Sequence, residues 1–113
     1  MRVTPRECRA AYSFLRETLP FRRWKLPDAD DLEFNITRVH STMGATISEG
    51  RQSIRIEISE KRHTHTATLL RTMGHEMIHV YENRLGIRSD HGKHFKRCQK
   101  LFAKHHGFDP GDC

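Results

Sequence analysis

The chain has 113 residues, 35% hydrophobic and 30% charged, a size that fits a single domain over residues 1–113. No apolar run approaches the roughly 20 residues that a bilayer requires, and the basic start lacks a signal-peptide core, so we expect an intracellular protein (cytoplasmic, nucleoid or nuclear) that is neither secreted nor membrane-associated. Lys and Arg outnumber Asp and Glu by 20 to 14, which favours an anionic partner such as nucleic acid.

The first segment predicts a helix that begins after Thr4 and ends before Pro20. Thr4 can cap it, Pro5 suits the first helical position, and Glu7 can complete a capping box. A connector bounded by prolines follows over residues 21–27, and three aspartates between residues 28 and 31 indicate a solvated turn.

Three segments then alternate apolar and polar residues, as expected of strands with one face exposed to water. Residues 48–52 between the second and third contain glycine and have hairpin length. We therefore expect a three-stranded antiparallel meander, with its apolar positions at Leu32, Phe34, Ile36, Met43, Ala45, Ile47, Ile54, Ile56 and Ile58.

Two helices complete the predicted α+β fold. From about Thr66 to Leu85 the apolar residues recur at helical spacing, and Gly86 can end this helix. A last helix is predicted from about Asp90, a good N-cap, to His106, with Gly107 after it.

The pentad His75-Glu76-Met77-Ile78-His79 lies inside the helix predicted over residues 66–85. Side chains four residues apart lie one above the other on a helix, so both imidazoles can bind one metal ion. At 100° per residue they point away from the apolar stripe of the same helix. Two solvated surface histidines are the alternative interpretation.

A catalytic zinc site needs a third protein ligand and one open position for water. The residues downstream offer His91 and His94. On the last predicted helix His91 lies on the same side as Phe95 and Cys98, whereas His94 is rotated toward the flank. This geometry favours one Zn²⁺ ion held by His75, His79 and His91, with His94 nearby or on the surface.

Glu76 is the candidate general base of such a site. It follows a ligand directly, so it lies beside the metal and can accept a proton from water and pass it to the leaving amine. The implied reaction is amide hydrolysis by a zinc metallopeptidase.

These residues resemble the SprT-like metalloprotease family, which includes Spartan, a protease that cleaves proteins crosslinked to DNA. The match is carried by the strand pair at residues 42–48 and 54–59, the pentad at 75–79, and His91-Gly92-Lys93-His94-Phe95, which is similar to the family's third-ligand motif. The resemblance implies a zincin-like core, His75, His79 and His91 as zinc ligands, Glu76 as general base, and protein substrates associated with or crosslinked to DNA, either single-stranded or at junctions.

Two basic segments are candidates for nucleic-acid contact. For the last helix, the alternative interpretation is a helix face that is merely exposed to solvent. In the connector, Trp24 is more consistent with a core residue than with a residue that stacks on a base. The candidate residues are Lys93, Lys96, Arg97, Lys100 and Lys104 on the last helix, and Arg22, Arg23, Trp24 and Lys25 in the connector.

Two other functions fit the same residues. One is a metallopeptidase that cleaves a dedicated repressor and does not need DNA. The other is a non-catalytic, basic DNA-binding module whose zinc is structural, closed by Cys98 or Cys113 as a fourth ligand.

Overall fold

The computed structural model describes residues 2–38, 41–60, 63, 65–88, 90–109 and 111. Its helices are α1 (Pro5–Arg16), α2 (Thr66–Leu85) and α3 (Lys93–His106), and its strands are β1 (Glu33–Thr37), β2 (Gly44–Glu49) and β3 (Gln52–Ser59). Two short 3₁₀ turns, η1 (Phe21–Arg23) and η2 (Ala29–Asp31), lie in the connector between α1 and β1. The α+β class predicted from the sequence is confirmed.

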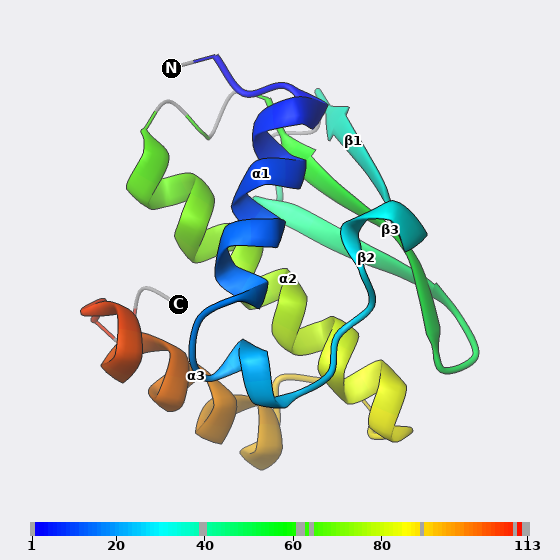
Figure 1. The fold of residues 1–113 in the computed structure, drawn as a ribbon, viewed down its shortest axis with the longest axis vertical. Helices are drawn as coiled ribbons and strands as arrows, with labels where there is room; N and C mark the ends of the chain where they lie inside the picture. The colour runs from blue at the N-terminus through cyan, green and yellow to red at the C-terminus, as the bar shows by residue number, and fades with distance from the viewer. Residues whose placement is uncertain are drawn as a thin grey trace.

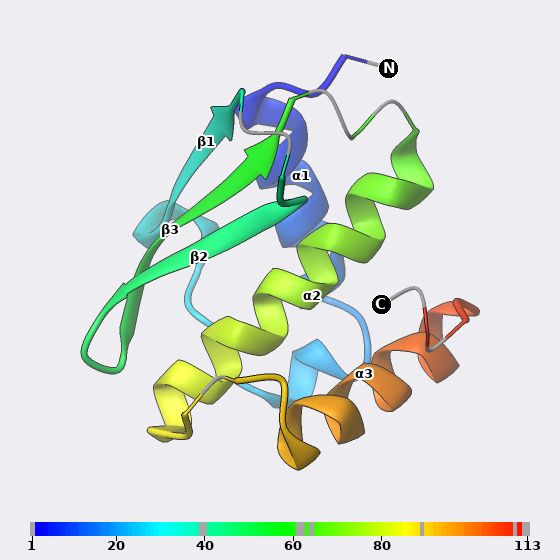
Figure 2. The ribbon, with the colours of Figure 1, turned by 180° about the vertical axis from the view of Figure 1, so that it is seen from behind.

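Helix α2 lies at the centre of the molecule, with the sheet on one side and α3 on another (Figure 1). Helix α1 packs against α2 and β1. Seen from behind, α2 runs beside the sheet in roughly the direction of β2 and β3, and α3 lies below it (Figure 2). Buried residues on α2 include Met73, Met77 and Ile78, which are fully excluded from solvent. Each layer of the fold is therefore attached to α2.

The sheet is mixed, so the prediction of an antiparallel meander is wrong. The strand order is β1-β3-β2; β2 and β3 form the expected antiparallel hairpin, but β1 pairs with β3 in parallel. Alternation tells which face of a strand is buried but not which strand is its neighbour. Burial decides the order: β3 is the longest strand and buries Ile56 and Ile58 completely, whereas β2 has no buried residue and forms an edge.

The ends of the helices follow the capping chemistry of the sequence. The backbone N–H of Thr4 donates to the Glu7 carboxylate at 3.1 Å, as the predicted capping box requires. Gly86 and Gly107 end α2 and α3 in the left-handed conformation, with φ of 72° and 75°. None of the helices in the described ranges is long and apolar enough to cross a membrane.

Gly74 allows α2 and α3 to approach each other closely. A Cβ built on Gly74 would overlap the ring of Phe102, which is fully buried on α3. Glycine inside a helix normally costs about 1 kcal/mol relative to alanine. At this position glycine is nevertheless required, because the Phe102 ring leaves no space for a side chain.

We therefore expect Gly74→Ala to destabilise the protein by about 1–3 kcal/mol, although alanine is the better helix former. Urea denaturation followed by circular dichroism measures the change. A double variant, Gly74→Ala with Phe102→Leu, serves as the control and should recover part of the loss, because leucine removes the ring atoms that clash. A Gly74→Ala protein as stable as the wild type would contradict this account of the helix contact.

Candidate metal centre

Helix α2 presents His75 and His79 one turn apart on the side that faces α3. Both side chains are half-buried, and their ring centroids are 5.0 Å apart. The buried residues of the helix, both apolar and polar, occupy its other faces, whereas these two imidazoles line a cleft. The sequence predicted this placement correctly.

His91 reaches the same place from the loop between α2 and α3, and its backbone differs from the prediction. It was expected in the first turn of a helix capped by Asp90; instead α3 starts at Lys93, with Gly92 as its N-cap. His91 has φ of 60°, in the left-handed region, which interrupts the helix. The Asp90 carboxylate accepts a hydrogen bond from the Gly92 N–H at 3.1 Å and so closes a small turn around His91.

The three imidazoles converge on one point. His91 Nε2 lies 3.2 Å from His75 Nε2 and 3.1 Å from His79 Nε2. One ring nitrogen has at most one proton to donate, so it cannot donate to both neighbours. Two nitrogens bound to one tetrahedral Zn²⁺ are about 3.3 Å apart, so the donor set and its spacing fit such an ion. These three histidines can hold a metal ion.

The predicted structural-zinc alternative needs a fourth protein ligand. Cys98 is buried on α3, and its sulfur lies 3.9 Å from His94 Nδ1. In the described part of the chain the ligand group contains the three histidines and no cysteine. Cys113 lies outside the described residues.

The ring of Phe95 supports all three imidazoles. Its centroid lies 4.8 Å from that of His75, 4.7 Å from that of His79 and 4.6 Å from that of His91. Phe95 is fully buried, so it fixes the rings from the core side and leaves their nitrogens pointing outward. The motif contained this aromatic residue, but the sequence alone did not reveal its contact with every ligand.

Glu76 points toward β2, away from α3. Its side chain is 4% exposed, and Oε1 accepts a hydrogen bond from the Thr46 hydroxyl at 2.8 Å. Burial raises the pKa of Glu76 to about 7, although the Thr46 hydrogen bond and the nearby His91 both act to lower it. Nothing in the sequence pattern marked Thr46, because the contact joins residues 30 positions apart.

The imidazole of His79 is held in its neutral form. Burial is the main cause that lowers its pKa to about 4, and the neighbouring His75 and His91 contribute to this decrease. A neutral imidazole keeps the lone pair that a metal ligand needs, so this ring is available for coordination throughout the physiological pH range.

A cleft of about 420 Å³ adjoins the three histidines. One wall is β2, from Gly44 to Ser48, and the other is formed by α2 and His91. Glu76 lines this cleft together with the three histidines. The ligand group and the carboxylate therefore open onto one cleft.

The comparison with known families agrees with this geometry. The sequence model of the SprT-like family matches residues 12–111. The chain belongs to the SprT-like family. Searches of curated proteins and of solved structures found no match. Membership of the SprT-like family is consistent with a metalloprotease-type role, and the matched range includes the three clustered histidines and Glu76.

The basic residues predicted to contact nucleic acid lie on two segments of this SprT-like chain, α3 and the connector. On α3 the five predicted residues are all exposed, and the first, Lys93, follows His91 by two positions. In the connector, Arg22, Arg23 and Lys25 are exposed. Trp24 is 9% exposed and stacks on Tyr81 with ring centroids 4.2 Å apart, so it is a core residue, as the packing alternative predicts.

His94 lies outside the ligand group. Its Nδ1 is 2.7 Å from the buried Glu82 carboxylate, and its ring lies beside Tyr81. Glu82 is on α2, so this pair links α2 to the first turn of α3. His94 therefore joins α2, which carries His75 and His79, to the helix that follows His91.

We predict that the protein binds one Zn²⁺ per chain and is stabilised by it, by about 3 kcal/mol when free Zn²⁺ exceeds its dissociation constant a hundred-fold. Replacing His75, His79 or His91 with alanine should weaken binding by about a hundred-fold or more. Titration calorimetry and thermal denaturation measure both effects. His105→Ala, an exposed histidine on α3, is the matched control and should bind zinc normally. Full affinity in His91→Ala would exclude this ligand set.

The raised pKa of Glu76 predicts a pH-dependent stability of the metal-free protein. The unfolded carboxyl ionises near pH 4.5, whereas the folded one keeps its proton up to about pH 7, so stability is lost as the pH rises through this interval. Glu76→Gln avoids this loss. Chelator-treated Glu76→Gln should be more stable than wild type by about 2–3 kcal/mol at pH 8, and nearly equal to it at pH 4.5.

Urea denaturation at both pH values measures this difference. Glu17→Gln changes an exposed carboxylate at the end of α1 and is the control, for which we expect little change at either pH. If Glu76→Gln and wild type are equally stable at pH 8, burial does not raise the pKa of Glu76 and the prediction is wrong.

Proposed function

We propose that the protein is a zinc-dependent metalloprotease with a zincin-like centre, and that it hydrolyses peptide bonds in proteins associated with or crosslinked to DNA. The observation that carries the proposal is the arrangement of two kinds of group around one cleft. Three imidazoles converge on one side, and the carboxylate of Glu76 is held on the other by Thr46. A purely structural zinc site needs no buried carboxylate beside it.

In this proposal His75, His79 and His91 hold the zinc ion. Bound zinc supplies Lewis-acid chemistry, which polarises the scissile carbonyl and lowers the pKa of water. Phe95 keeps the three rings in place from the core side.

Glu76 is the proton carrier of the proposed reaction. Its Oε1 is engaged by the Thr46 hydroxyl, so Oε2 is the oxygen that accepts a proton from the attacking water. The same oxygen then gives this proton to the nitrogen of the leaving amine.

Strand β2 offers a binding edge for an extended substrate. It is the outer strand in the order β1-β3-β2, and residues 44–48 form one wall of the cleft that Glu76 faces. A peptide that pairs with such an edge gains main-chain hydrogen bonds independent of its sequence. This mode suits an enzyme that acts on many different proteins.

The basic surface of α3 supports DNA as a partner. Its five cations are exposed on one helix that begins two residues after His91, so DNA on α3 would lie close to the cleft. Arg22, Arg23 and Lys25 offer a second contact, whereas Trp24 is buried, stacks on Tyr81 and makes an edge contact with Phe21. Affinity that depends on phosphate contacts decreases with salt, which gives this part of the proposal a direct measurement.

The test incubates zinc-loaded protein with a histone, with and without single-stranded DNA. We expect cleavage that increases with DNA and decreases by about a hundred-fold or more in Glu76→Gln, because general-base catalysis contributes at least that factor. Lys96→Glu with Lys100→Glu should abolish the DNA stimulation but not the basal cleavage. Arg2→Glu with Arg6→Glu makes the same charge change away from α3 and should keep the stimulation.

Each other outcome points to one of the two remaining functions. Cleavage that ignores DNA would favour the enzyme with a dedicated repressor as its substrate. The structural-zinc module would be favoured, and the proposal contradicted, if the protein binds zinc but cleaves nothing. In that case Glu76→Gln should bind DNA with the same affinity as wild type.

A further inference from the structure

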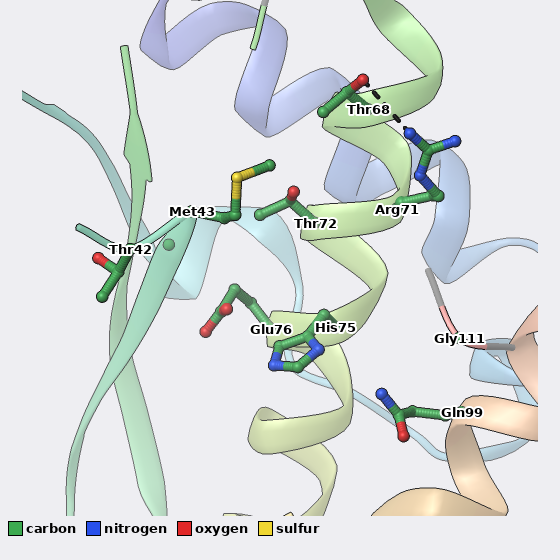
Figure 3. A pocket seen from close by; sticks show the side chains of 10 residues that line it. Thr42, Met43, Thr68, Arg71, Thr72, His75, Glu76, Gln99 and Gly111 are labelled. Carbon is green, nitrogen blue, oxygen red and sulfur yellow. Dashed lines mark hydrogen bonds between the residues drawn. The ribbon is translucent and has the colours of Figure 1, made fainter. Parts of the chain in front are cut away.

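A second and larger cavity, of about 590 Å³, adjoins the centre on the side of the N-terminal half of α2. It is bounded by the segment that leads into β2, by α2 between Thr68 and Glu76, and by Gln99 of α3. Figure 3 shows Arg71 one turn before His75, and Thr72 and Met43 on the opposite side. The cavity shares His75 and Glu76 with the cleft described above, so one substrate can occupy both.

Arg71 brings a positive charge to this cavity, and no carboxylate of the described residues neutralises it. Its guanidinium is 3.5 Å from the Thr68 hydroxyl and 5.6 Å from the centre of the Phe108 ring. Both partners are neutral, and among the described residues no carboxylate oxygen lies within ion-pair distance of Arg71. The side chain is only half-buried, so the charge remains accessible from the cavity.

The other described groups around the cavity do not supply the missing negative charge. Thr68, Thr72 and Gln99 are neutral, and the Thr72 hydroxyl is 2.8 Å from His63 Nε2. Glu76 is the one carboxylate in the described lining, but it is bonded to Thr46 and lies about 7.5 Å further along the helix axis than Arg71. An anion next to Arg71 is therefore attracted more strongly than it is repelled.

We propose that this cavity is a specificity pocket in which Arg71 binds a carboxylate of the substrate, next to the scissile bond. Arginine is well matched to this ligand, because its planar guanidinium can donate two parallel hydrogen bonds to one carboxylate. The carboxylate is either an Asp or Glu side chain within the substrate or the free C-terminus of the substrate chain. This inference rests on the proposed protease function, because it defines which peptides that function selects.

The experiment uses a set of fluorogenic peptides with one position at a time occupied by Glu, Gln or Lys. Each peptide is made with a free and with an amidated C-terminus, which separates the two sources of the carboxylate. We measure kcat/KM with the zinc-loaded protein, and binding to Glu76→Gln by fluorescence anisotropy. If the carboxylate is a side chain, kcat/KM at one position should be about ten-fold or more higher for Glu than for Gln. If it is the C-terminus, every peptide with a free C-terminus should be cleaved about ten-fold or more faster than its amidated form.

Variants of Arg71 assign the preference. Arg71→Gln should reduce it to about one, Arg71→Lys should retain part of it, and Arg71→Glu should transfer it to Lys-containing peptides. Arg6→Gln removes an exposed arginine of α1 and is the control, which should keep the wild-type preference. Circular dichroism and zinc content confirm that each variant is folded and loaded.

The outcomes separate this inference from the proposed function. Cleavage without any carboxylate preference, or a preference that Arg71→Gln leaves unchanged, would overturn the pocket but not the protease. If wild type cleaves no peptide, the binding data decide on the pocket alone, and the protease proposal fails only if the histone is not cleaved either. Tighter binding of carboxylate peptides that is lost with Arg71→Gln would support the pocket, and equal binding would overturn it.

Discussion

The structure depends on the enclosure of α2, a helix surrounded by the sheet, α1 and α3. Polar side chains on most faces of such a helix cannot reach water. Each of these buried polar groups therefore needs a hydrogen-bond partner from another part of the chain. His63, after β3, contacts the hydroxyl of Thr72. The Thr46 hydroxyl of β2 donates a hydrogen bond to Glu76, and His94 of α3 contacts the carboxylate of Glu82. Three polar contacts thus attach the surrounding elements to α2 in addition to the apolar core.

The same enclosure gives the candidate site its chemical character. Residues 75 and 76 are adjacent in sequence but point in different directions, so the imidazole meets α3 while the carboxylate meets β2. Burial is unfavourable for a charged carboxylate and for a charged imidazole, and it moves the pKa values of Glu76 and His79 in opposite directions. A carboxyl group that exchanges its proton near neutral pH and a neutral imidazole thereby result from one physical cause.

Local patterns predicted much of this arrangement. The bounds of α2 follow from helical periodicity and from the glycine at position 86, and the convergence of His75, His79 and His91 was expected from their spacing. The strand order was not predictable, because alternation defines faces and not neighbours. The left-handed backbone of His91 and the contact from Thr46 depend on tertiary packing, which leaves no local signal.

The close approach of α2 and α3 at Gly74 has a consequence beyond the stability of the core. Gly74 and His75 are adjacent on α2, while the Phe102 ring that Gly74 accommodates belongs to the same helix as Phe95. The spacing between these two helices therefore sets how far His91 and Phe95 stand from His75 and His79. A glycine without a side chain thus acts as a spacer between the three histidines, so the size of the ion that they could hold is linked to the packing of the two helices.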